Sequence, residues 1–415
     1  MKQDANLYNN IKSIRTRLGL SQQDLANIAG VTRQTISGVE SRQYTPSVAI
    51  TLRLAKALGC KVEDLFWFEQ DLPEIEAVLS RAVPETQKFR VSIARVSGQW
   101  IAYPLVGKDA FRTEMIAADG EAFVLNKAVE ELPKGLESRS KILDPSGRGE
   151  GFAAEYPESK TKNQTGANIV RVRLLDDVDK LHNTVVIAGC APVISLWARA
   201  TEHWHPQLRV NYTFANSMAA LHSLCRGEVH IAGMHLYDSQ TGEHNVPFAR
   251  EILAGKEAVL ITLGIWEEGL LVPPGNPMGI QTVADLASRG VSIANREPGA
   301  GSRIILEQLL EREKVPLNAV KGFDYILHSH QDVAKAVVSG IVNAGVSTAS
   351  IADIYGLGFV SLHHSRYDLV ILKEYLQEAP VQQLLGTLGH RLVRSQFEIL
   401  GGYDTSRIGE VVANI

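Results

Sequence analysis

Residues 21–40, SQQDLANIAGVTRQTISGVE, decide the fold of the N-terminal part of this chain. They predict two short helices joined by a tight turn, because Gly30 stands where the first helix must end and Thr32 can cap the second. The early turns of the second helix carry Arg, Gln, Thr and Ser together, which is unusual for a buried structural helix. Gln and Arg make paired hydrogen bonds to base edges in the major groove. The stretch therefore predicts a helix-turn-helix that contacts DNA.

Further helices are expected around this stretch. Residues 7–17 predict an amphipathic helix, and residues 47–58 and 62–66 predict two more, which completes a five-helix bundle. The polar loop 41–46 and the start of the helix after Ser21 suit phosphate contacts. The candidate DNA-facing side chains are Gln22, Gln23, Arg33, Gln34, Thr35, Ser37, Arg42, Tyr44 and Thr45.

Length and charge agree with a DNA-binding module attached to a second kind of domain. A chain of 415 residues is too long for one core, so two or three domains are expected. The formal net charge is −4, but residues 1–58 hold eight Lys and Arg against three Asp and Glu. A basic head on an acidic body is typical of such an arrangement.

The cysteines and the apolar pattern indicate a cytoplasmic protein. The three cysteines are far apart and odd in number, which gives neither a disulfide framework nor a paired metal-ligand spacing. The first ten residues lack the apolar core of a secretory signal. No apolar run is long enough to cross a bilayer, so no membrane partner is expected.

The N-terminal motifs also carry a family resemblance. GLSQQDLA at 19–26, AGVTRQTISGVE at 29–40 and PSVAITLRLAKALGC at 46–60 resemble the phage-repressor-like (Cro/C1, XRE) helix-turn-helix family over residues 7–67. The resemblance implies that Gln22 and residues 32–37, which begin with Thr32, face DNA.

A different texture follows, and residues 69–182 predict a small β-rich connector domain. Residues 89–96 and 99–106 predict a hairpin, and residues 115–125 predict a second one. Residues 144–166 are rich in Gly, Pro, Ser, Lys and Glu and predict a loop.

The rest of the chain, residues 183–415, predicts an α/β domain with two lobes. A strand at 184–188 leads into a helix, and a helix ending at 224 is followed by a strand at 229–232. A similar helix-and-strand unit recurs over residues 331–346, which suggests two lobes that face each other.

Two apolar segments and several helix starts would complete this domain. Residues 258–272 and 359–372 are long enough to cross between the lobes. A glycine-rich turn at 295–303 opens a helix, which is a common arrangement for binding an anion. Three further helix starts are expected to point at the same cleft, at residues 190–192, 216–217 and 329–331.

This region resembles the type-2 periplasmic-binding-protein fold, in the branch of the molybdate- and tungstate-binding proteins. The resemblance covers residues 183–410 and depends on GLLVPPGNPMGI at 269–280, VADLASRGVSIANREPGAGSRIILEQLL at 283–310 and LGGYDTSRIGE at 400–410. Molybdate carriers favour Ser or Thr where this chain has Cys190, so the resemblance leaves the oxyanion open. The candidate ligand-binding residues are Cys190, Ala191, Asn216, Ser217, Arg296, Gly301, Ser302, Arg303, His330 and Ser347.

Other chemistry is expected to be absent. The histidines lack a cysteine or carboxylate that would complete a metal-ligand set, so no metal site is predicted, and His330 alone is expected to contact a ligand. Isolated cysteines such as Cys190 are expected to pack as small apolar side chains. Arg296 and Arg303 each have a glutamate for a partner, and Arg303 is the better candidate to bind an anion. No nucleophile-and-base set or nucleotide loop is recognised, so no catalysis and no cofactor are expected.

These features predict a multidomain protein: an all-α helix-turn-helix bundle (1–68), a β-rich connector (69–182) and a two-lobed α/β periplasmic-binding-protein-like domain (183–415). The expected function is a ligand-responsive one-component transcriptional regulator. Its partners would be double-stranded DNA, a small anion such as molybdate or tungstate or another polar metabolite, and a second copy of the chain. Two alternatives stay open: a molybdenum-metabolism cofactor-handling protein or enzyme with a DNA-binding head, and a repressor whose lobes bind a protein partner.

Overall fold

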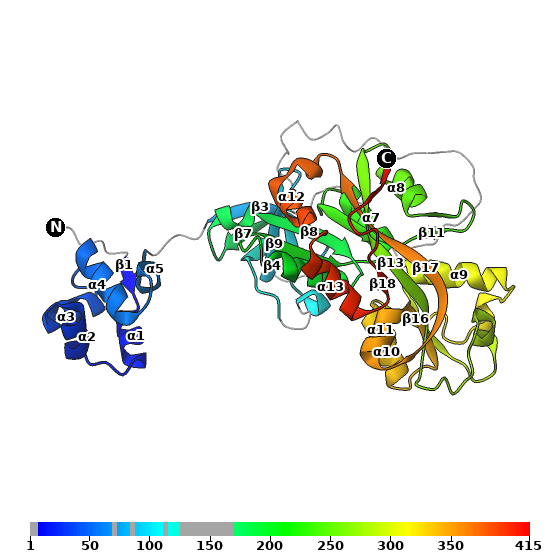
Figure 1. The fold of residues 1–415 in the computed structure, drawn as a ribbon. Coiled ribbons are helices and arrows are strands. Elements are labelled where there is room, and N and C mark those ends of the chain that lie inside the picture. The colour runs from blue at the N-terminus through cyan, green and yellow to red at the C-terminus, as the bar shows by residue number, and fades with distance from the viewer. Residues whose placement is uncertain (1–6, 69–72, 84–87, 111–114, 125–168) are drawn as a thin grey trace. The chain divides into compact units, whose positions relative to one another are not determined.

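The computed structural model describes residues 7–68, 73–83, 88–110, 115–124 and 169–415. The chain forms two compact units, Met1–Leu72 and Pro73–Ile415, and Figure 1 shows their elements. None of the helices in the described ranges is long and apolar enough to cross a membrane. The predicted loop at 144–166 lies outside the described residues.

The first unit is the predicted five-helix bundle. Its helices are α1 (Ile11–Arg17), α2 (Gln22–Ala29), α3 (Arg33–Glu40), α4 (Val48–Leu58) and α5 (Val62–Leu65). Their apolar faces form one core, which includes the fully buried Ile11, Leu25, Ile36, Leu54 and Leu65.

The ends of the helices follow the expected signals. The Ser21 hydroxyl accepts a hydrogen bond from the Asp24 amide, and the Asp24 carboxylate accepts one from the Ser21 amide. Gly30 ends α2 with φ +64°, a left-handed conformation that glycine adopts without strain. Thr32 caps α3 by accepting from the Thr35 amide at 3.0 Å. The predicted turn between α2 and α3 is therefore confirmed.

Two predictions for this unit are wrong. Residues 7–9 do not extend the first helix, and Phe66 does not end the last one. Instead β1 (Leu7–Asn9) pairs antiparallel with β2 (Phe66–Phe68) and ties the start of the bundle to its end. Tyr8 and all three residues of β2 are aromatic, and aromatic side chains are favoured in strands.

The second unit begins with a closed five-stranded barrel, in the order β3-β5-β4-β6-β7. The hairpin of β4 (Lys88–Val96) and β5 (Gln99–Pro104) is confirmed. The second predicted hairpin is wrong, because β6 (Gly120–Val124) pairs with β4 and β7 (Ile169–Leu174) and not with residues 115–118. Strand β3 (Glu74–Leu79) pairs with β5 and β7 and closes the barrel.

The barrel shares a core with the domain that follows it. Ala94, Val96 and Ile101 of the barrel are buried in the same apolar cluster as Val186 and Trp197. A side chain also joins the two parts. His230 accepts a hydrogen bond from the Val186 amide at Nδ1 (3.0 Å), and its Nε2 lies 3.2 Å from the Arg95 carbonyl oxygen.

The two-lobed domain is built on one mixed sheet, in the order β15-β14-β16-β13-β17-β10-β8-β9. The first lobe contains β8 (Thr184–Gly189), β9 (Arg209–Phe214) and β10 (Ile231–Met234). The second contains β14 (Ile293–Arg296), β15 (Ile326–Leu327) and β16 (Ala344–Thr348). The helices of this domain are α6 (Val193–Thr201), α7 (Ser217–Cys225), α8 (Val246–Leu253), α9 (Gly301–Arg312), α10 (His330–Val338), α11 (Ala349–Tyr355), α12 (Ala379–Gly386) and α13 (Arg391–Leu400).

Two long antiparallel strands cross between the lobes, as the sequence predicts. β13 (Ala258–Val272) and β17 (Gly358–Leu372) each have fifteen residues and pair along their whole length. They run through the centre of the domain in Figure 1. One end of β13 pairs with β19 (Val411–Asn414) and the other with β16. The pairing of β13 with β17 is irregular at Thr262/Gly264 and at Glu268/Gly269, so the register of these two strands shifts near the lobe junction.

The repeated helix-and-strand units are present with shifted strand boundaries. The first strand is β10, two residues later than predicted, and the second is β16, which starts three residues later. Ile341, expected within that strand, is 62% exposed in the turn before it. The apolar run therefore began before the backbone entered the sheet, and only the buried part forms the strand.

Candidate functional site

Helix α3 presents a polar face to solvent. Arg33, Gln34 and Ser37 are exposed, whereas Ile36 and Val39 are buried in the bundle. Thr35 is half-buried, and its hydroxyl lies 2.8 Å from that of Thr32. The polar side chains of α3 are therefore available for base contacts.

Two of the other DNA candidates are held by contacts within the bundle. The Gln22 amide donates to Glu40 Oε2 at 2.8 Å, and the same carboxylate accepts from Arg15 at 2.6 Å. Burial opposes ionisation of Glu40, but the hydrogen bonds from Arg15 and Gln22 leave its pKa below the ordinary value. Gln23 donates to Asn27 at 2.9 Å and stays exposed.

The loop after α3 packs against Gly38, and this contact explains why a glycine stands there; the sequence alone gives no reason for it. A Cβ at Gly38 would meet the Tyr44 Cβ at 3.2 Å, and the Gly38 carbonyl accepts from the Gln43 and Tyr44 amides. Gly38 therefore lets the loop fold back on α3. Tyr44 and Thr45 are exposed there.

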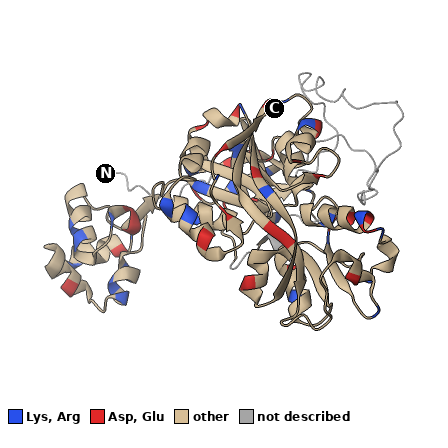
Figure 2. Cartoon of the chain, turned by 45° about the vertical axis from the view of Figure 1, so that its right-hand side comes forward, with Lys and Arg blue, Asp and Glu red and all other residues tan. Residues whose placement is uncertain are grey.

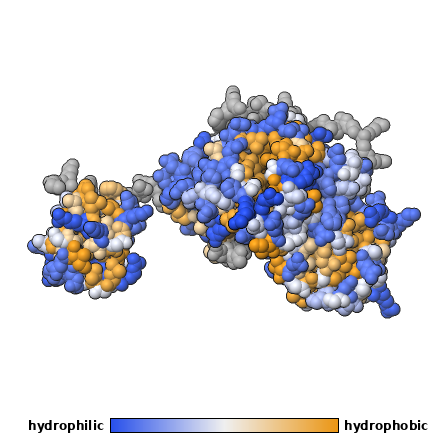
Figure 3. Space-filling view, viewed as in Figure 1, coloured by the Kyte–Doolittle hydropathy of each residue, from blue (hydrophilic) through white to orange (hydrophobic). Residues whose placement is uncertain are grey.

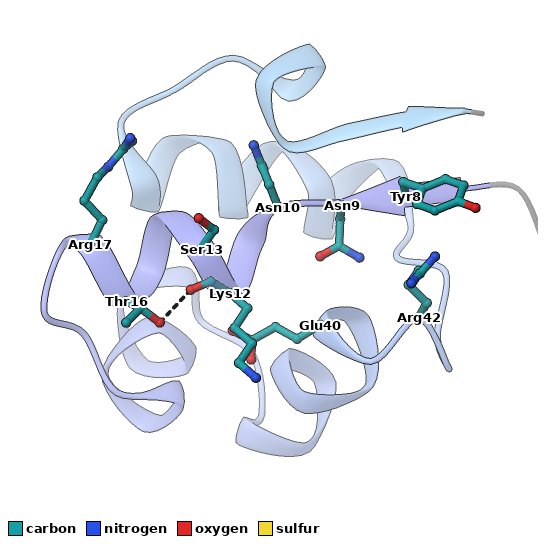
Figure 4. Close-up of a pocket in the computed structure, with 9 residues that line it drawn as sticks. All are labelled: Tyr8, Asn9, Asn10, Lys12, Ser13, Thr16, Arg17, Glu40 and Arg42. Carbon is teal, nitrogen blue, oxygen red and sulfur yellow. Dashed lines mark hydrogen bonds between the residues drawn. The ribbon is translucent and has the colours of Figure 1, made fainter. Parts of the chain in front are cut away.

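An open pocket of about 660 Å³ lies between α1 and the end of α3 (Figure 4). Lys12, Arg17 and Arg42 bring three cationic side chains to it, and Arg42 lies 4.6 Å from the centre of the Tyr8 ring. This basic surface beside α3 is suited to phosphate. The pocket is lined by Tyr8, Asn9, Asn10, Lys12, Ser13, Thr16, Arg17, Glu40 and Arg42.

A second site, the interlobe cluster, lies where the two lobes meet the crossing strands. We define it as Cys190, His235, Glu268, His330 and the residues bonded to them. Cys190 follows β8 and His235 follows β10, so both belong to the first lobe. Glu268 lies on β13, and His330 begins α10 in the second lobe. None of the four side chains is more than 3% exposed.

Hydrogen bonds connect three of these side chains, Cys190, His235 and Glu268, in a row. Cys190 Sγ lies 3.3 Å from His235 Nε2, and His235 Nδ1 lies 3.2 Å from Glu268 Oε2. The same carboxylate accepts from the hydroxyls of Ser302, at the start of α9, and Ser365, on β17. Glu268 thus takes donors from both lobes and from the neighbouring crossing strand.

The electrostatics of this row follow from one buried carboxylate. Burial disfavours a charged His235, but Glu268 and then Cys190 favour it more strongly and raise its pKa to about 10. Burial also disfavours ionised Glu268, yet His235 and the two serines hold its pKa below the ordinary range. The pair is therefore imidazolium and carboxylate at neutral pH. Burial lowers the pKa of His330 well below its usual value, so that imidazole is neutral.

Close packing of the backbone brings the lobes together here. A Cβ at Gly301, the first residue of α9, would lie 2.1 Å from the His235 carbonyl oxygen. The Asn216 side chain caps α7 and also donates to the Pro298 carbonyl at 3.2 Å. The Ser217 hydroxyl accepts from the His235 amide at 3.1 Å. These contacts place α7 and the α9 start on opposite sides of one junction.

Several of the predicted ligand residues lie in or beside the interlobe cluster. Some of their polar atoms are already bonded to other residues of the protein. Ser347 accepts from or donates to His330 Nδ1 at 3.1 Å. Ala191 is buried in the apolar core of the first lobe. The Cys190 amide donates to Tyr367 Oη at 3.2 Å, so this helix start is already bonded within the protein.

The expected glutamate partners of the two arginines are present, and the preference for Arg303 as the anion partner stays a prediction. Arg303, preferred as the anion partner, pairs with Glu307 at 2.7 Å and donates to the Arg296 carbonyl. Arg296 is fully buried and pairs with Glu297 at 2.9 Å, while its Nη1 has no hydrogen-bond partner among the described residues. Arg296 is therefore the arginine with an unused buried donor.

The sequence reasoning did not identify part of the cluster. Cys190 is buried in the apolar core of the first lobe, as expected, and its Sγ also lies 3.3 Å from His235 Nε2. His235 and Glu268 were not singled out, although Glu268 interrupts the apolar run of β13, a signal that could have found it. Trp266, one strand repeat from Glu268, is buried with its Nε1 unpartnered in the described structure.

Comparison with known proteins matches two separate parts of the chain. A helix-turn-helix family matches residues 11–65, and the PBP superfamily domain matches residues 198–389. The chain is 43% identical over 65 residues to the uncharacterized HTH-type transcriptional regulator YgzD of Bacillus subtilis, which is 16% of this chain and 98% of YgzD. It is 33% identical over 201 residues to the uncharacterized protein YvgK of the same organism, which is 48% of this chain. The match covers 64% of YvgK, less than two thirds of its length.

Solved structures are similar to the two-lobed domain at low identity. The sulfate-binding protein SubI from Mycobacterium tuberculosis matches with a TM-score of 0.41 and 15% identity, over 54% of this chain and 86% of SubI. An ABC-type phosphate transport receptor from Vibrio cholerae matches with a TM-score of 0.38 and 14% identity, over 53% and 98%.

Proposed function

Because the chain belongs to the helix-turn-helix transcriptional regulators and carries a PBP superfamily domain after that module, we propose that it is a ligand-responsive one-component regulator. In this proposal the first unit binds operator DNA in the cytoplasm and the two-lobed domain binds a small molecule between its lobes. The protein acts by binding and does not catalyse a reaction.

For DNA, α3 lies in the major groove. Arg33, Gln34 and Ser37 are exposed on one face and supply base contacts. The N-terminus of α2 and the loop with Arg42, Tyr44 and Thr45 contact phosphates. Such contacts fix the register of α3 on the duplex.

A second copy of the chain reads the other half-site. Helix-turn-helix proteins of this type bind as dimers to half-sites about one helical turn apart. Helix α4 carries Val48 and Leu52, 76% and 57% exposed, one turn apart on its surface. Apolar residues are visible at the surface of the bundle in Figure 3. These side chains supply apolar area for contact between two copies.

One observation carries the ligand site. His330 Nε2, Trp266 Nε1 and Arg296 Nη1 are buried near the lobe junction, and none has a hydrogen-bond partner in the described residues. Buried polar atoms without partners are costly, so they mark places where a ligand completes the bonding. His330 and Arg296 belong to the second lobe and Trp266 to the crossing strand β13, so a ligand bonded to these atoms would lie where the second lobe meets the crossing strands.

The charges bear on the ligand class. A small anion such as molybdate, or another polar metabolite, remains the class suggested by the sequence. In the interlobe cluster, however, Glu268 already accepts from Ser302, Ser365 and His235. An oxyanion would have to compete with this carboxylate for the Ser302 hydroxyl. The cluster therefore favours a polar ligand that brings positive charge or its own donors.

Ligand binding would act on DNA through the crossing strands. Lobe closure about β13 and β17 is a hinge motion, and a ligand shifts the equilibrium only if it binds one arrangement more tightly. The barrel moves with the first lobe because the two share a core. Lys, Arg, Asp and Glu are interspersed over this second unit (Figure 2), which does not resemble a DNA-binding face.

The test is operator binding by the full-length protein. DNA selected from a random pool is titrated with protein, with and without molybdate, tungstate, phosphate, amino acids and divalent metal ions. The proposal predicts that at least one ligand changes the DNA dissociation constant. DNA affinity that ignores every ligand bound by the second unit would contradict it.

A further inference from the structure

Three side chains of the interlobe cluster bring metal-binding atoms together. Cys190 and His235 from the first lobe and His330 from the second each offer one ligand atom, and these atoms all lie within 4.8 Å of one another. One pair is closer, because Cys190 Sγ lies 3.3 Å from His235 Nε2. Ligand atoms around tetrahedral zinc are separated by roughly 3–4 Å, given metal bonds of about 2.0–2.3 Å. A small movement of His330 therefore completes the set.

Both imidazoles are already oriented for metal binding. His235 Nδ1 is bonded to Glu268 Oε2, and His330 Nδ1 is bonded to Ser347 Oγ. Metal-bound histidines commonly direct their second nitrogen to a carboxylate or another oxygen, which fixes the ring. This bonding leaves His330 Nε2 without a protein partner among the described residues, while His235 Nε2 faces Cys190 Sγ, the other proposed ligand atom.

An unpartnered atom points independently to a ligand. His330 is 1% exposed, and its Nε2 has no hydrogen-bond partner in the described part of the chain. A buried nitrogen without a partner is destabilising, and a metal ion beside it removes that cost.

The charge of the surroundings suits a cation. Binding of a divalent ion would displace the protons of the Cys190 thiol and of His235 Nε2, and the Cys190 thiolate and Glu268 would then place two negative charges beside the ion. Arg296, the buried cation of the second lobe, is neutralised by Glu297. One thiolate and two imidazoles are ligands that Zn²⁺ and Cu⁺ accept, whereas Mg²⁺ and Ca²⁺ prefer oxygen.

The same residues resemble a thiol nucleophile with a histidine base and a carboxylate, but the surroundings fit that role less well. A nucleophile needs donors that stabilise the charge on its substrate. The Cys190 amide instead donates to Tyr367 Oη, which packs closely against Gly189 and Gly233. This amide is therefore not available to a substrate. Cys190 itself is 3% exposed.

We propose that Cys190 Sγ, His235 Nε2 and His330 Nε2 bind one thiophilic transition-metal ion of the Zn²⁺ and Cu⁺ class, with Glu268 and Ser347 as positioning residues. The ion joins a ligand pair on the first lobe to a ligand on the second, so it favours the closed arrangement. Its role as the effector that changes DNA affinity rests on the proposed function above; its binding does not.

The experiment uses full-length protein freed of metal by a chelator and kept reduced. Zn²⁺ is titrated by calorimetry, Cu⁺ by competition with a coloured chelator under anaerobic conditions, and Co²⁺ by absorption. We expect one ion per chain and a thiolate-to-cobalt charge-transfer band. Cys190→Ser and His330→Gln should lose this binding, and Glu268→Gln should weaken it by roughly 10–100-fold.

Matched controls show whether the loss is specific. Cys225→Ser removes a half-buried thiol that donates to the Ile252 carbonyl, and His203→Gln removes an exposed imidazole. Both should bind the ion as the unchanged protein does. Circular dichroism and the thermal midpoint report whether each variant is folded. The cobalt band needs no variant, so bound Co²⁺ without that band would overturn the proposal.

The two proposals fail differently. No stoichiometric ion, or equal Zn²⁺ affinity in Cys190→Ser and the unchanged protein, overturns the metal site. A change in DNA affinity with molybdate, tungstate or phosphate would then still support the regulator. If the ion binds at these residues and DNA affinity ignores it together with every other bound ligand, the metal site stands and the proposed function is overturned.

Discussion

His235 Nδ1 lies 3.2 Å from Glu268 Oε2, and this contact joins the first lobe to a strand that crosses into the second. Both residues are almost fully buried, so the pair is shielded from water and salt. The same carboxylate holds Ser302 at the start of α9. Glu268 is thus the point at which both lobes are tied to the crossing strands.

The first prediction concerns this pair. Glu268→Ala should lower the free energy of unfolding of the second unit by about 3–5 kcal/mol, because it leaves His235 buried without its partner. The measurement is urea unfolding followed by tryptophan fluorescence. Glu267→Ala, on the neighbouring half-exposed side chain, should change it by only about 0.5 kcal/mol. Equal effects of the two substitutions would show that the buried pair adds nothing.

The second prediction concerns the approach of the lobes. Gly301→Ala places a methyl group 2.1 Å from the His235 carbonyl oxygen, so α9 and the first lobe must move apart. We expect a loss of about 1–3 kcal/mol in stability, as for other overpacked sites, and weaker ligand binding. Gly386→Ala is the control because a Cβ there meets nothing within 4 Å. A thermal midpoint that both variants share with the unchanged protein would contradict the prediction.

The third prediction is a pH dependence of stability from His230. Burial lowers its pKa from 6.5 to about 4, against a smaller opposite effect of the Arg95 carbonyl. The unfolded chain therefore takes up a proton near pH 6.5 that the folded chain refuses until about pH 4. Stability should be full above pH 6.5 and fall by about 3 kcal/mol as the pH drops to 4.

The hydrogen bonds of His230 also explain why its pKa is low in the folded protein. Nδ1 of His230 accepts from the Val186 amide, so a proton on Nδ1 would face another donor. Glu378 lies 3.5 Å from Nε2, but the neutral ring makes no ion pair with it. Unfolding titrations of the unchanged protein and of His230→Gln across this pH range make the comparison. A slope of equal size in both would assign the effect to other groups.

How much of this could be read from the sequence depends on whether the signal is local. Ser21, Gly30 and Thr32 mark helix ends through their own backbone and hydroxyl chemistry, and all three are confirmed. The crossing strands β13 and β17 were found from apolar length alone. The pairing of β1 with β2 was missed because residues 7 and 68 meet only after the bundle folds.

The candidate sites show the same division. Exposed Arg33 and Gln34 follow from the period of one helix. The interlobe cluster brings together residues 45 positions apart, Cys190 and His235, and a third ligand, His330, from another lobe. The sequence spacing of these three residues does not match any recognised metal-binding motif. The second hairpin failed for a related reason, since β6 pairs with β4 and β7 and not with its neighbour in sequence.

The fourth prediction concerns DNA. Gln34→Ala should reduce discrimination between operator and unrelated DNA by about 1–3 kcal/mol, because a base contact is lost. Arg42→Ala should weaken binding to all sequences alike, as expected for a phosphate contact. Lys56→Ala, an exposed cation at the end of α4, is the control for charge alone. Competition binding at fixed salt measures each ratio, and a Gln34→Ala protein with unchanged sequence preference would refute the groove assignment.

The most direct test of the central claim is the dissociation constant of the full-length protein for its selected operator, measured with and without a ligand known to occupy the second unit. The account predicts a ligand-dependent change of about 5–150-fold, the range of typical coupling energies. If the ligand is the proposed metal ion, this change disappears in Cys190→Ser and persists in Cys225→Ser. An operator dissociation constant that stays the same whether the second unit is empty or saturated would contradict it.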